Sequence, residues 1–175
     1  MSQRVLVVID MQNDFITGSL GTKEAQAIVE KVCRKIQGFD GEVLFTLDTH
    51  GPDYLETQEG RLLPVAHCIK GTPGWELEPR VRALCRTTPI EKPTFGSTGL
   101  ADVLQAKHLH GGGLDEVVFV GLCTDICVVS NALLVKARLP EVPLTVDVPC
   151  CAGVTPEAHQ HALAVLRSCL IHVEE

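Results

Sequence analysis

Short apolar runs alternate with amphipathic segments along most of this sequence, and that alternation limits the folds open to the chain. Arg4–Ile9, Glu42–Leu47 and Glu116–Val120 are dominated by Val, Leu, Ile and Phe, as is typical of strands buried on both faces. Since parallel strands need crossover helices, the pattern predicts an α/β fold with three layers, α/β/α, around a mostly parallel six-stranded sheet. The other predicted strands are Thr88–Glu91, Leu144–Val148 and Leu170–Val173, and the predicted helices are Thr22–Gln37, Trp75–Cys85, Leu100–Lys107, Asp125–Arg138 and Pro156–Cys169.

Composition narrows the class of protein. A chain of 175 residues with 45% hydrophobic content can build one complete core, so we expect a single domain over residues 1–175. The net charge of −7 argues against nucleic acid and anionic membranes as partners. No apolar run approaches the roughly 20 residues of a membrane span, and the start of the chain lacks the pattern of a signal peptide. We therefore expect a cytoplasmic protein whose eight cysteines stay reduced; the adjacent Cys150 and Cys151 suggest no specific role.

Polar residues follow several of the predicted strands. Asp10 follows the first strand, Asp48 and His50 follow the second, Lys92 follows the third, and Cys127 lies shortly after the fourth. Ligands of parallel sheets bind beyond the carboxyl ends of the strands. We therefore expect these side chains to meet at one edge of the sheet.

Cys127 is the candidate nucleophile. It is predicted in the first turn of a helix, where the macrodipole and the free N–H groups favour a thiolate and could hold an oxyanion. Asp10 could accept the thiol proton and later deliver it to a leaving amine, while Lys92 keeps both groups charged. The alternatives are a small buried cysteine without reactivity, an aspartate that caps a turn, and a solvated lysine.

The long Gly- and Pro-rich loop after the second strand contains a second group of candidates. Asp48 and His50 are two residues apart, so on an extended segment they face the same way, and His67 follows later in the loop. Glu56 and Glu59 lie between them. Two imidazoles with one or two carboxylates suit Zn²⁺, Fe²⁺ or Mn²⁺, and the alternative is a polar loop with surface histidines.

Five segments carry a resemblance to a known family. VIDMQNDF at Val8–Phe15, EKPTFGS at Glu91–Ser97 and GLCTDICV at Gly121–Val128 resemble the isochorismatase-like cysteine hydrolases. DTH at Asp48–His50 and LPVAHCIKGTPGWEL at Leu63–Leu77 resemble their nicotinamidase branch. Order and spacing are kept over nearly the whole chain, so the resemblance extends to the fold.

The resemblance implies a catalytic triad of Asp10, Lys92 and Cys127. It also implies a non-proline cis peptide between Leu122 and Cys123, which turns the Cys123 N–H toward the oxyanion. The second oxyanion donor would be the N–H of Cys127. These roles make the chain a cysteine amidohydrolase that works through a thioester.

The resemblance further implies a divalent metal beside the triad, held by the Asp–His–His set of the long loop. Zinc is the first expectation, with iron and manganese as alternatives. Tyr54 stands where many members of the family have a histidine ligand. Glu59 is therefore the predicted fourth ligand, with Glu56 as the alternative.

The implied substrate is a small carboxamide, with nicotinamide converted to nicotinate and ammonia as the leading expectation. Phe15, Trp75 and Leu122 are the predicted substrate contacts, and Phe15 and Trp75 could stack on a flat ring, with core packing as the alternative. Other substrates remain open at this point: a carbamoyl or ureido compound, or isochorismate. A catalytically silent binding module of the same fold is a further alternative, and family resemblance suggests a homo-oligomer.

Overall fold

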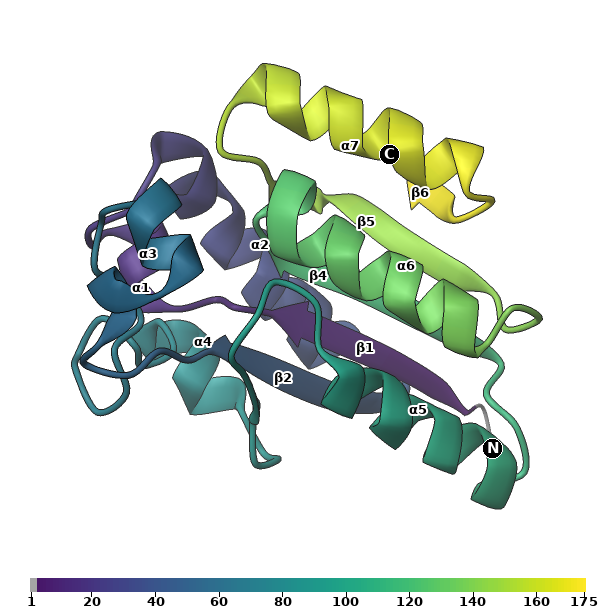
Figure 1. Ribbon diagram of the computed structural model, residues 1–175. Helices are drawn as coiled ribbons and strands as arrows, with labels where there is room; N and C mark the ends of the chain where they lie inside the picture. Colours follow the sequence, from purple (N-terminus) through teal and green to yellow (C-terminus); the bar gives the residue numbers. More distant parts are fainter. Residues whose placement is uncertain (1–2) are drawn as a thin grey trace.

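The computed structural model describes residues 3–175, and a six-stranded sheet forms its centre (Figure 1). All neighbouring strands are parallel, in the order β3-β2-β1-β4-β5-β6. The α/β fold predicted from the alternating pattern is confirmed. The strands are β1 (Arg4–Ile9), β2 (Glu42–Asp48), β3 (Ile90–Lys92), β4 (Glu116–Leu122), β5 (Leu144–Ala152) and β6 (His172–Glu174).

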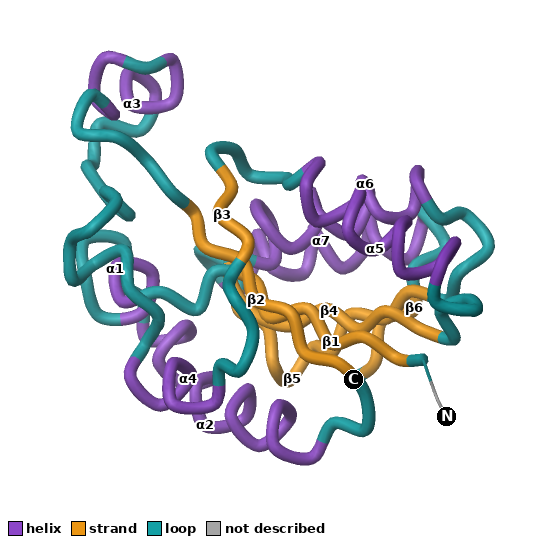
Figure 2. The backbone as a smooth tube through the Cα atoms, turned by 90° about the horizontal axis from the view of Figure 1, so that it is seen from below, coloured by secondary structure: helices purple, strands orange, loops and turns teal. Residues whose placement is uncertain are grey.

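Helices cover both faces of the sheet (Figures 1 and 2). Alternate residues of β1 point to opposite faces: Val5, Val7 and Ile9 pack in one core, and Leu6 and Val8 pack in the other. Both faces are therefore buried, which explains why the strands are apolar throughout. The first core lies under α5 (Thr98–His110), α6 (Val129–Arg138) and α7 (Pro156–Ser168), and the second under α2 (Lys23–Gly38) and α4 (Pro79–Leu84).

Three short helices escaped the sequence prediction. They are α1 (Asn13–Ile16), the 3₁₀ turn η1 (Tyr54–Glu56) and α3 (Gln58–Leu62). Each is shorter than the two turns over which a helical apolar period becomes visible. The sequence did contain an N-cap residue for α3. The Thr57 hydroxyl accepts the N–H of Gly60 and so caps the first turn of this helix.

Two predicted helices begin later than expected. The segment after β4 starts as a π-helical turn, η2 (Thr124–Val128), and continues as α6 from Val129. Such turns occur often at functional sites. The helix predicted from Trp75 begins only at Pro79, because Glu78 is its N-cap and accepts the N–H groups of Arg80 and Val81.

The central strands approach each other closely at their carboxyl ends. Gly121 of β4 is paired with Ile9 of β1 and has φ +116°. A Cβ atom at position 121 would lie 2.1 Å from the carbonyl oxygen of Ile9, so only glycine fits this contact. Figure 2 shows α1 and α3 beyond this end of the sheet. Within residues 3–175, no helix has the length and apolar character that crossing a membrane requires.

Candidate active site

Asp10, Lys92 and Cys127 meet at the carboxyl edge of the sheet, as predicted from their positions after β1, β3 and β4. The Lys92 Nζ atom lies 2.6 Å from Oδ2 of Asp10 and 3.4 Å from Sγ of Cys127. Asp10 and Lys92 are fully buried, and Cys127 is 4% exposed. The three groups thus form one cluster that is shielded from bulk water.

Lys92 is the cation of this cluster. Its Nζ atom also lies 3.2 Å from Oδ1 of Asp48 and donates to the carbonyl oxygen of Thr94 at 3.2 Å. Burial alone would lower the pKa of Lys92, but its interactions with Asp10, Cys127 and Asp48 raise it well above its usual value. Lys92 therefore stays an ammonium at every working pH.

The thiolate predicted for Cys127 is not what the structure supports. Burial raises the pKa of this thiol well above its usual range, and the charge of Asp10 adds to the effect. Lys92 offsets only part of it. The sequence argument placed Cys127 in the first turn of an ordinary helix, whereas it sits in a buried π-helical turn. The raised pKa favours the neutral thiol, so a nucleophilic role for Cys127 would need a base that accepts its proton.

Asp10 is the candidate acceptor of that proton. It lies just beyond β1 with φ +46°, a left-handed conformation that Asp tolerates better than most residues. The Thr46 hydroxyl on β2 donates to Oδ1 of Asp10 at 2.6 Å, while Oδ2 is ion-paired with the Lys92 ammonium at 2.6 Å. Burial raises the pKa of Asp10 above its usual value despite the opposing charge of Lys92. A more basic carboxylate is a better proton acceptor.

The turn that carries Cys127 is anchored by a residue the sequence analysis missed. Asn131, fully buried on α6, donates to the carbonyl oxygens of Cys127 at 2.8 Å and Phe95 at 3.0 Å. Its Oδ1 atom accepts the N–H of Ser97 at 2.9 Å. The sequence did contain a signal for this role: Asn131 is a polar residue four positions, or one helical turn, after Cys127. The peptide bond between Leu122 and Cys123 is cis, as the family resemblance implied.

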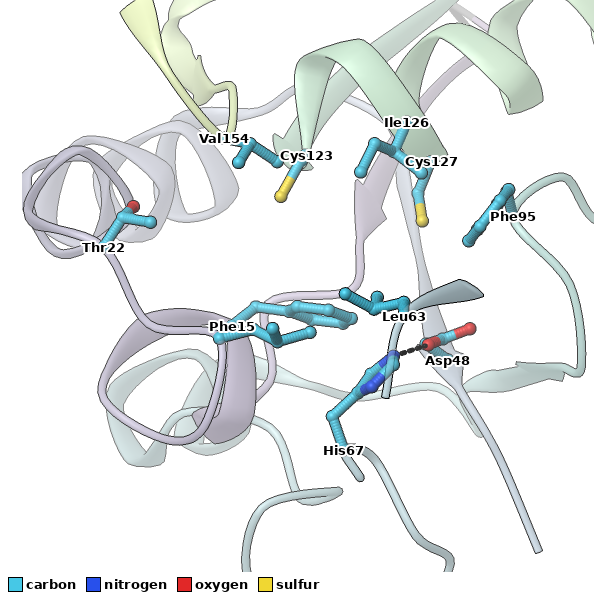
Figure 3. A pocket seen from close by; sticks show the side chains of 11 residues that line it. Phe15, Thr22, Asp48, Leu63, His67, Phe95, Cys123, Ile126, Cys127 and Val154 are labelled. Atoms are coloured by element: carbon cyan, nitrogen blue, oxygen red, sulfur yellow. Dashed lines mark ion pairs between the residues drawn. The ribbon is translucent and has the colours of Figure 1, made fainter. Parts of the chain in front are cut away.

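Cys127 opens into a cavity of about 240 Å³. Figure 3 shows Cys123, Ile126 and Cys127 along one side and the Phe15 ring with His67 opposite them. Among the residues that the structure describes, the lining is mostly apolar and includes no lysine or arginine. It consists of Phe15, Leu20, Thr22, Asp48, Leu63, His67, Phe95, Cys123, Ile126, Cys127 and Val154.

Only one of the three predicted substrate contacts lines this cavity. Phe15 does, with its ring centroid 5.6 Å from that of His67. The predictions for Trp75 and Leu122 are corrected. Leu122 is 1% exposed in the core beneath α2, and Trp75 packs against the same core while its indole N–H donates to Thr49 at 2.9 Å. Both residues are close to the site in sequence, but their side chains leave it because core packing takes them.

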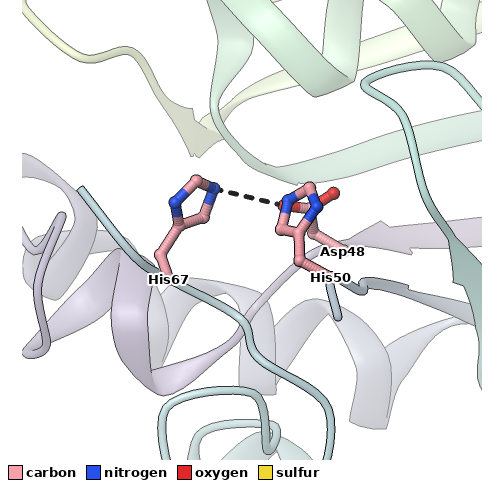
Figure 4. Close-up of side chains that lie close together, drawn as sticks. All are labelled: Asp48, His50 and His67. Carbon is pink, nitrogen blue, oxygen red and sulfur yellow. Dashed lines mark hydrogen bonds and ion pairs between the residues drawn. The ribbon is translucent and has the colours of Figure 1, made fainter. Parts of the chain in front are cut away.

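Asp48, His50 and His67 form a second cluster beside the triad (Figure 4). The Nε2 atoms of His50 and His67 lie 2.9 and 3.5 Å from Oδ2 of Asp48. Oε1 of Glu59 lies 3.6 Å from Nε2 of His50 and 3.8 Å from that of His67. The structure thus brings all four predicted metal ligands together.

The donor atoms of this cluster fit a divalent metal. Ligands about 2.1 Å from a tetrahedral zinc ion are separated by about 3.4 Å, close to the separations found here. Oε1 of Glu59 is buried without a hydrogen-bond donor, although such atoms are normally satisfied. Burial raises the pKa of Asp48, but contacts with both histidines and Lys92 outweigh it and hold that pKa well below its usual range. The alternative ligand Glu56 is exposed and lies outside the cluster.

Neighbouring groups orient these four side chains. Nδ1 of His67 lies 2.8 Å from the carbonyl oxygen of Val65, which leaves Nε2 for the cluster. Tyr54 stands where many family members have a histidine ligand. Its ring packs against both imidazoles, with centroid distances of 4.7 Å to His50 and 4.9 Å to His67. Gln12 is fully buried, and its amide both donates to and accepts from the backbone of Asp48. Tyr54 and Gln12 are therefore supports of the cluster.

The chain shares this architecture with known proteins. The isochorismatase domain model matches residues 4–175. The nicotinamidase/pyrazinamidase of Mycobacterium tuberculosis is 27% identical, over 97% of each chain. The crystal structure of a nicotinamidase from Bacillus subtilis aligns with a TM-score of 0.82 and 30% identity over 99% of each chain. A pyrazinamidase of Pyrococcus horikoshii in complex with zinc aligns with a TM-score of 0.78 and 25% identity over 99% of each chain. The chain therefore belongs to the isochorismatase family, in the branch that contains the nicotinamidases.

Proposed function

We propose that this protein is an amidase that hydrolyses a small neutral aromatic carboxamide, with nicotinamide as the leading candidate, to the carboxylate and ammonia. One observation carries the proposal. The buried cluster of Asp10, Lys92 and Cys127 opens into an apolar cavity, and two residues of the four-ligand cluster, Asp48 and His67, line that same cavity. Similarity to nicotinamidases and pyrazinamidases supports the same substrate class.

In the proposed reaction, Oδ2 of Asp10 takes the proton from Cys127 as Sγ bonds to the amide carbon. The N–H groups of Cys123 and Cys127 hold the oxyanion that forms. The proton then passes from Asp10 to the amide nitrogen and the C–N bond breaks. Ammonia leaves, and a thioester between Cys127 and the acyl group remains. Water loses a proton to Asp10 as it attacks the thioester, the C–S bond breaks, and the sulfur is protonated again.

The four-ligand cluster contributes to substrate orientation in this proposal. A divalent ion held by Asp48, His50, Glu59 and His67 would supply a Lewis-acidic site for the nitrogen of a heteroaromatic ring. Phe15 packs near this cluster and presents an apolar face to the same ring. Together these contacts would fix the carboxamide carbon opposite Cys127.

The cavity lining separates this proposal from other cysteine hydrolase reactions. Carbamoyl or ureido acids and isochorismate carry carboxylates, which binding sites usually hold with lysine or arginine. The lining of this cavity has neither, and Lys92 beneath it already contacts Asp10 and Asp48. A neutral ring suits such a lining better than an anion does.

The test is ammonia release from nicotinamide, pyrazinamide, benzamide and an N-carbamoyl amino acid, each with and without a chelator. We expect turnover of the two heteroaromatic amides, loss of it on chelation, and weak turnover of benzamide because its ring has no nitrogen. A preference for the carbamoyl compound, or equal rates for benzamide and nicotinamide, would contradict the substrate proposal.

Cys127→Ala is the matching test of the mechanism. We expect no measurable ammonia release from this variant, since the thioester cannot form, together with an unchanged circular dichroism spectrum. Cys151→Ala is the control, because Cys151 is equally buried but lies outside the cavity lining. Wild-type turnover by the Cys127 variant would exclude the thioester route.

A further inference from the structure

Asp14 has no part in the proposed reaction, yet its carboxylate is held in a specific place. It lies in α1, and its Oδ2 atom accepts the backbone N–H of Cys68 at 2.8 Å. Cys68 directly follows the candidate ligand His67, is fully buried, and has φ +47°. Asp14 thus contacts the backbone next to a ligand, at a residue held in an uncommon conformation.

Two glycines leave room for this carboxylate. A Cβ atom at Gly74 would lie 2.1 Å from Oδ2 of Asp14, and one at Gly18 would lie 2.4 Å from its Oδ1. The carboxylate therefore fills a space that any larger residue at these positions would occupy.

Two further hydrogen bonds hold the backbone on either side of His67. The Ser19 hydroxyl donates to the carbonyl oxygen of Ala66 at 3.1 Å. The backbone N–H of His50 donates to the carbonyl oxygen of Cys68 at 3.0 Å. His67 is therefore held between α1 and the end of β2, where Asp48 and His50 lie. Without Asp14, the buried N–H of Cys68 would lose its acceptor, and the left-handed conformation of Cys68 would lose a restraint.

We propose that Asp14 is a positioning residue of the metal site. It acts through the Cys68 N–H to keep Nε2 of His67 aligned with Asp48 and His50. The inference rests on the proposed metal site and adds the residue that pre-forms it. It separates metal affinity from the chemistry at Cys127, which Asp14 does not contact.

Co²⁺ binding to the metal-free protein provides the test, followed by its visible absorption and by competition with a chelator. We expect Asp14→Ala to weaken Co²⁺ binding by about 10- to 100-fold, the usual effect of losing a group that orients a ligand. Gly74→Ala should do the same, because its methyl group displaces the intact carboxylate. Asp14→Asn should largely restore binding, since its amide oxygen can still accept the Cys68 N–H.

Two control variants match these changes. Asp40→Ala removes an exposed carboxylate at the opposite edge of the sheet, and Gly99→Ala adds a methyl group in α5 with its nearest contact at 3.7 Å. Both should bind Co²⁺ like the wild type. Urea unfolding of each metal-free variant identifies a merely structural role, which would lower stability and leave Co²⁺ affinity unchanged.

The outcomes are distinct. If the wild type binds Co²⁺ and Asp14→Ala binds it equally well with the same spectrum, the role of Asp14 is excluded while the metal site stands. If the wild type binds no Co²⁺, the metal site itself is refuted, and the role of Asp14 with it. Rescue by Asn combined with loss in Gly74→Ala would establish the positioning role even if the alanine variant at Asp14 fails to fold.

Discussion

At the scale of single residues, one ammonium group holds the candidate active site together. Lys92 contacts the carboxylates of Asp10 and Asp48 and the sulfur of Cys127, and all of these groups are buried. A buried charge without a partner is far more costly than a buried pair. Lys92 therefore has two effects that substitution should reveal together, on the charge balance of the fold and on proton transfer.

Replacing Lys92 with Met keeps most of the side-chain volume and removes the charge. We expect the free energy of unfolding to fall by about 3–5 kcal/mol, because two buried carboxylates lose their cation. Turnover should fall by about 10²–10⁴-fold, the usual contribution of a positioned acid–base group. Urea unfolding and ammonia release measure the two effects. Lys70→Met, which breaks only an exposed pair with Glu91, should change neither by much.

At the scale of elements, the amino ends of the central strands are joined by a polar contact far from the site. Glu116 begins β4, accepts from Arg4 of β1 at 2.7 Å, and accepts the hydroxyl of Thr145 on β5 at 2.8 Å. Burial raises the pKa of Glu116, but these hydrogen bonds and the charge of Arg4 outweigh it and hold that pKa below its usual value. One carboxylate thus links three neighbouring strands.

This lowered pKa predicts a pH-dependent contribution to stability. The folded carboxylate binds its proton less readily than the unfolded one, so stabilisation is present above pH 4.5 and is lost as the pH falls through the lower folded pKa. Glu116→Gln should lower the free energy of unfolding at pH 7 by about 0.5–1 kcal/mol, since the pair is partly exposed. The difference in urea unfolding between variant and wild type should shrink as the pH falls below 4.5 and vanish once the folded carboxylate is protonated. A difference that persists after protonation would mean that packing, not charge, is responsible.

The elements also show what the sequence could predict. Buried strands such as β1 can be predicted from the sequence because both of their faces are apolar. The parallel topology alone was enough to predict that the polar residues at the ends of these strands lie at one edge of the sheet. The short helices around Tyr54 and Glu59 were missed, because one or two turns carry no period and their conformation depends on packing against His50 and His67. Trp75 and Leu122 were predicted as substrate contacts but do not line the cavity, for a related reason: tertiary packing, which a linear motif does not record, decides where their side chains lie.

At the scale of the whole molecule, the candidate metal site joins parts of the chain that the sheet does not connect. Asp48 ends β2, Glu59 lies in α3, and His67 lies in the loop beyond it. The intervening chain packs outside the sheet, beyond its carboxyl edge (Figure 2). A bound ion would therefore tie this peripheral segment to the sheet, and its removal should be felt in the stability of the molecule.

Metal removal should lower the thermal stability of the protein. A ligand present at 100 times its Kd, bound only by the folded state, adds about 2.7 kcal/mol to the free energy of unfolding. In a domain of this size that corresponds to a shift in Tm of roughly 5–11 °C. Calorimetry of the dialysed protein with added Zn²⁺, and again with a chelator, measures the shift.

Two variants separate metal binding from catalysis in the same measurement. His67→Ala should lose the Zn²⁺-dependent shift, because a ligand is gone. Cys127→Ala should keep the full shift although it is inactive, since the sulfur contacts Lys92 and not the four-ligand cluster. Hydrogen exchange should show the added protection concentrated in the segment from Tyr54 to Cys68. Protection spread evenly over the sheet would mean that the ion binds elsewhere, and that the orphaned oxygen of Glu59 needs another explanation.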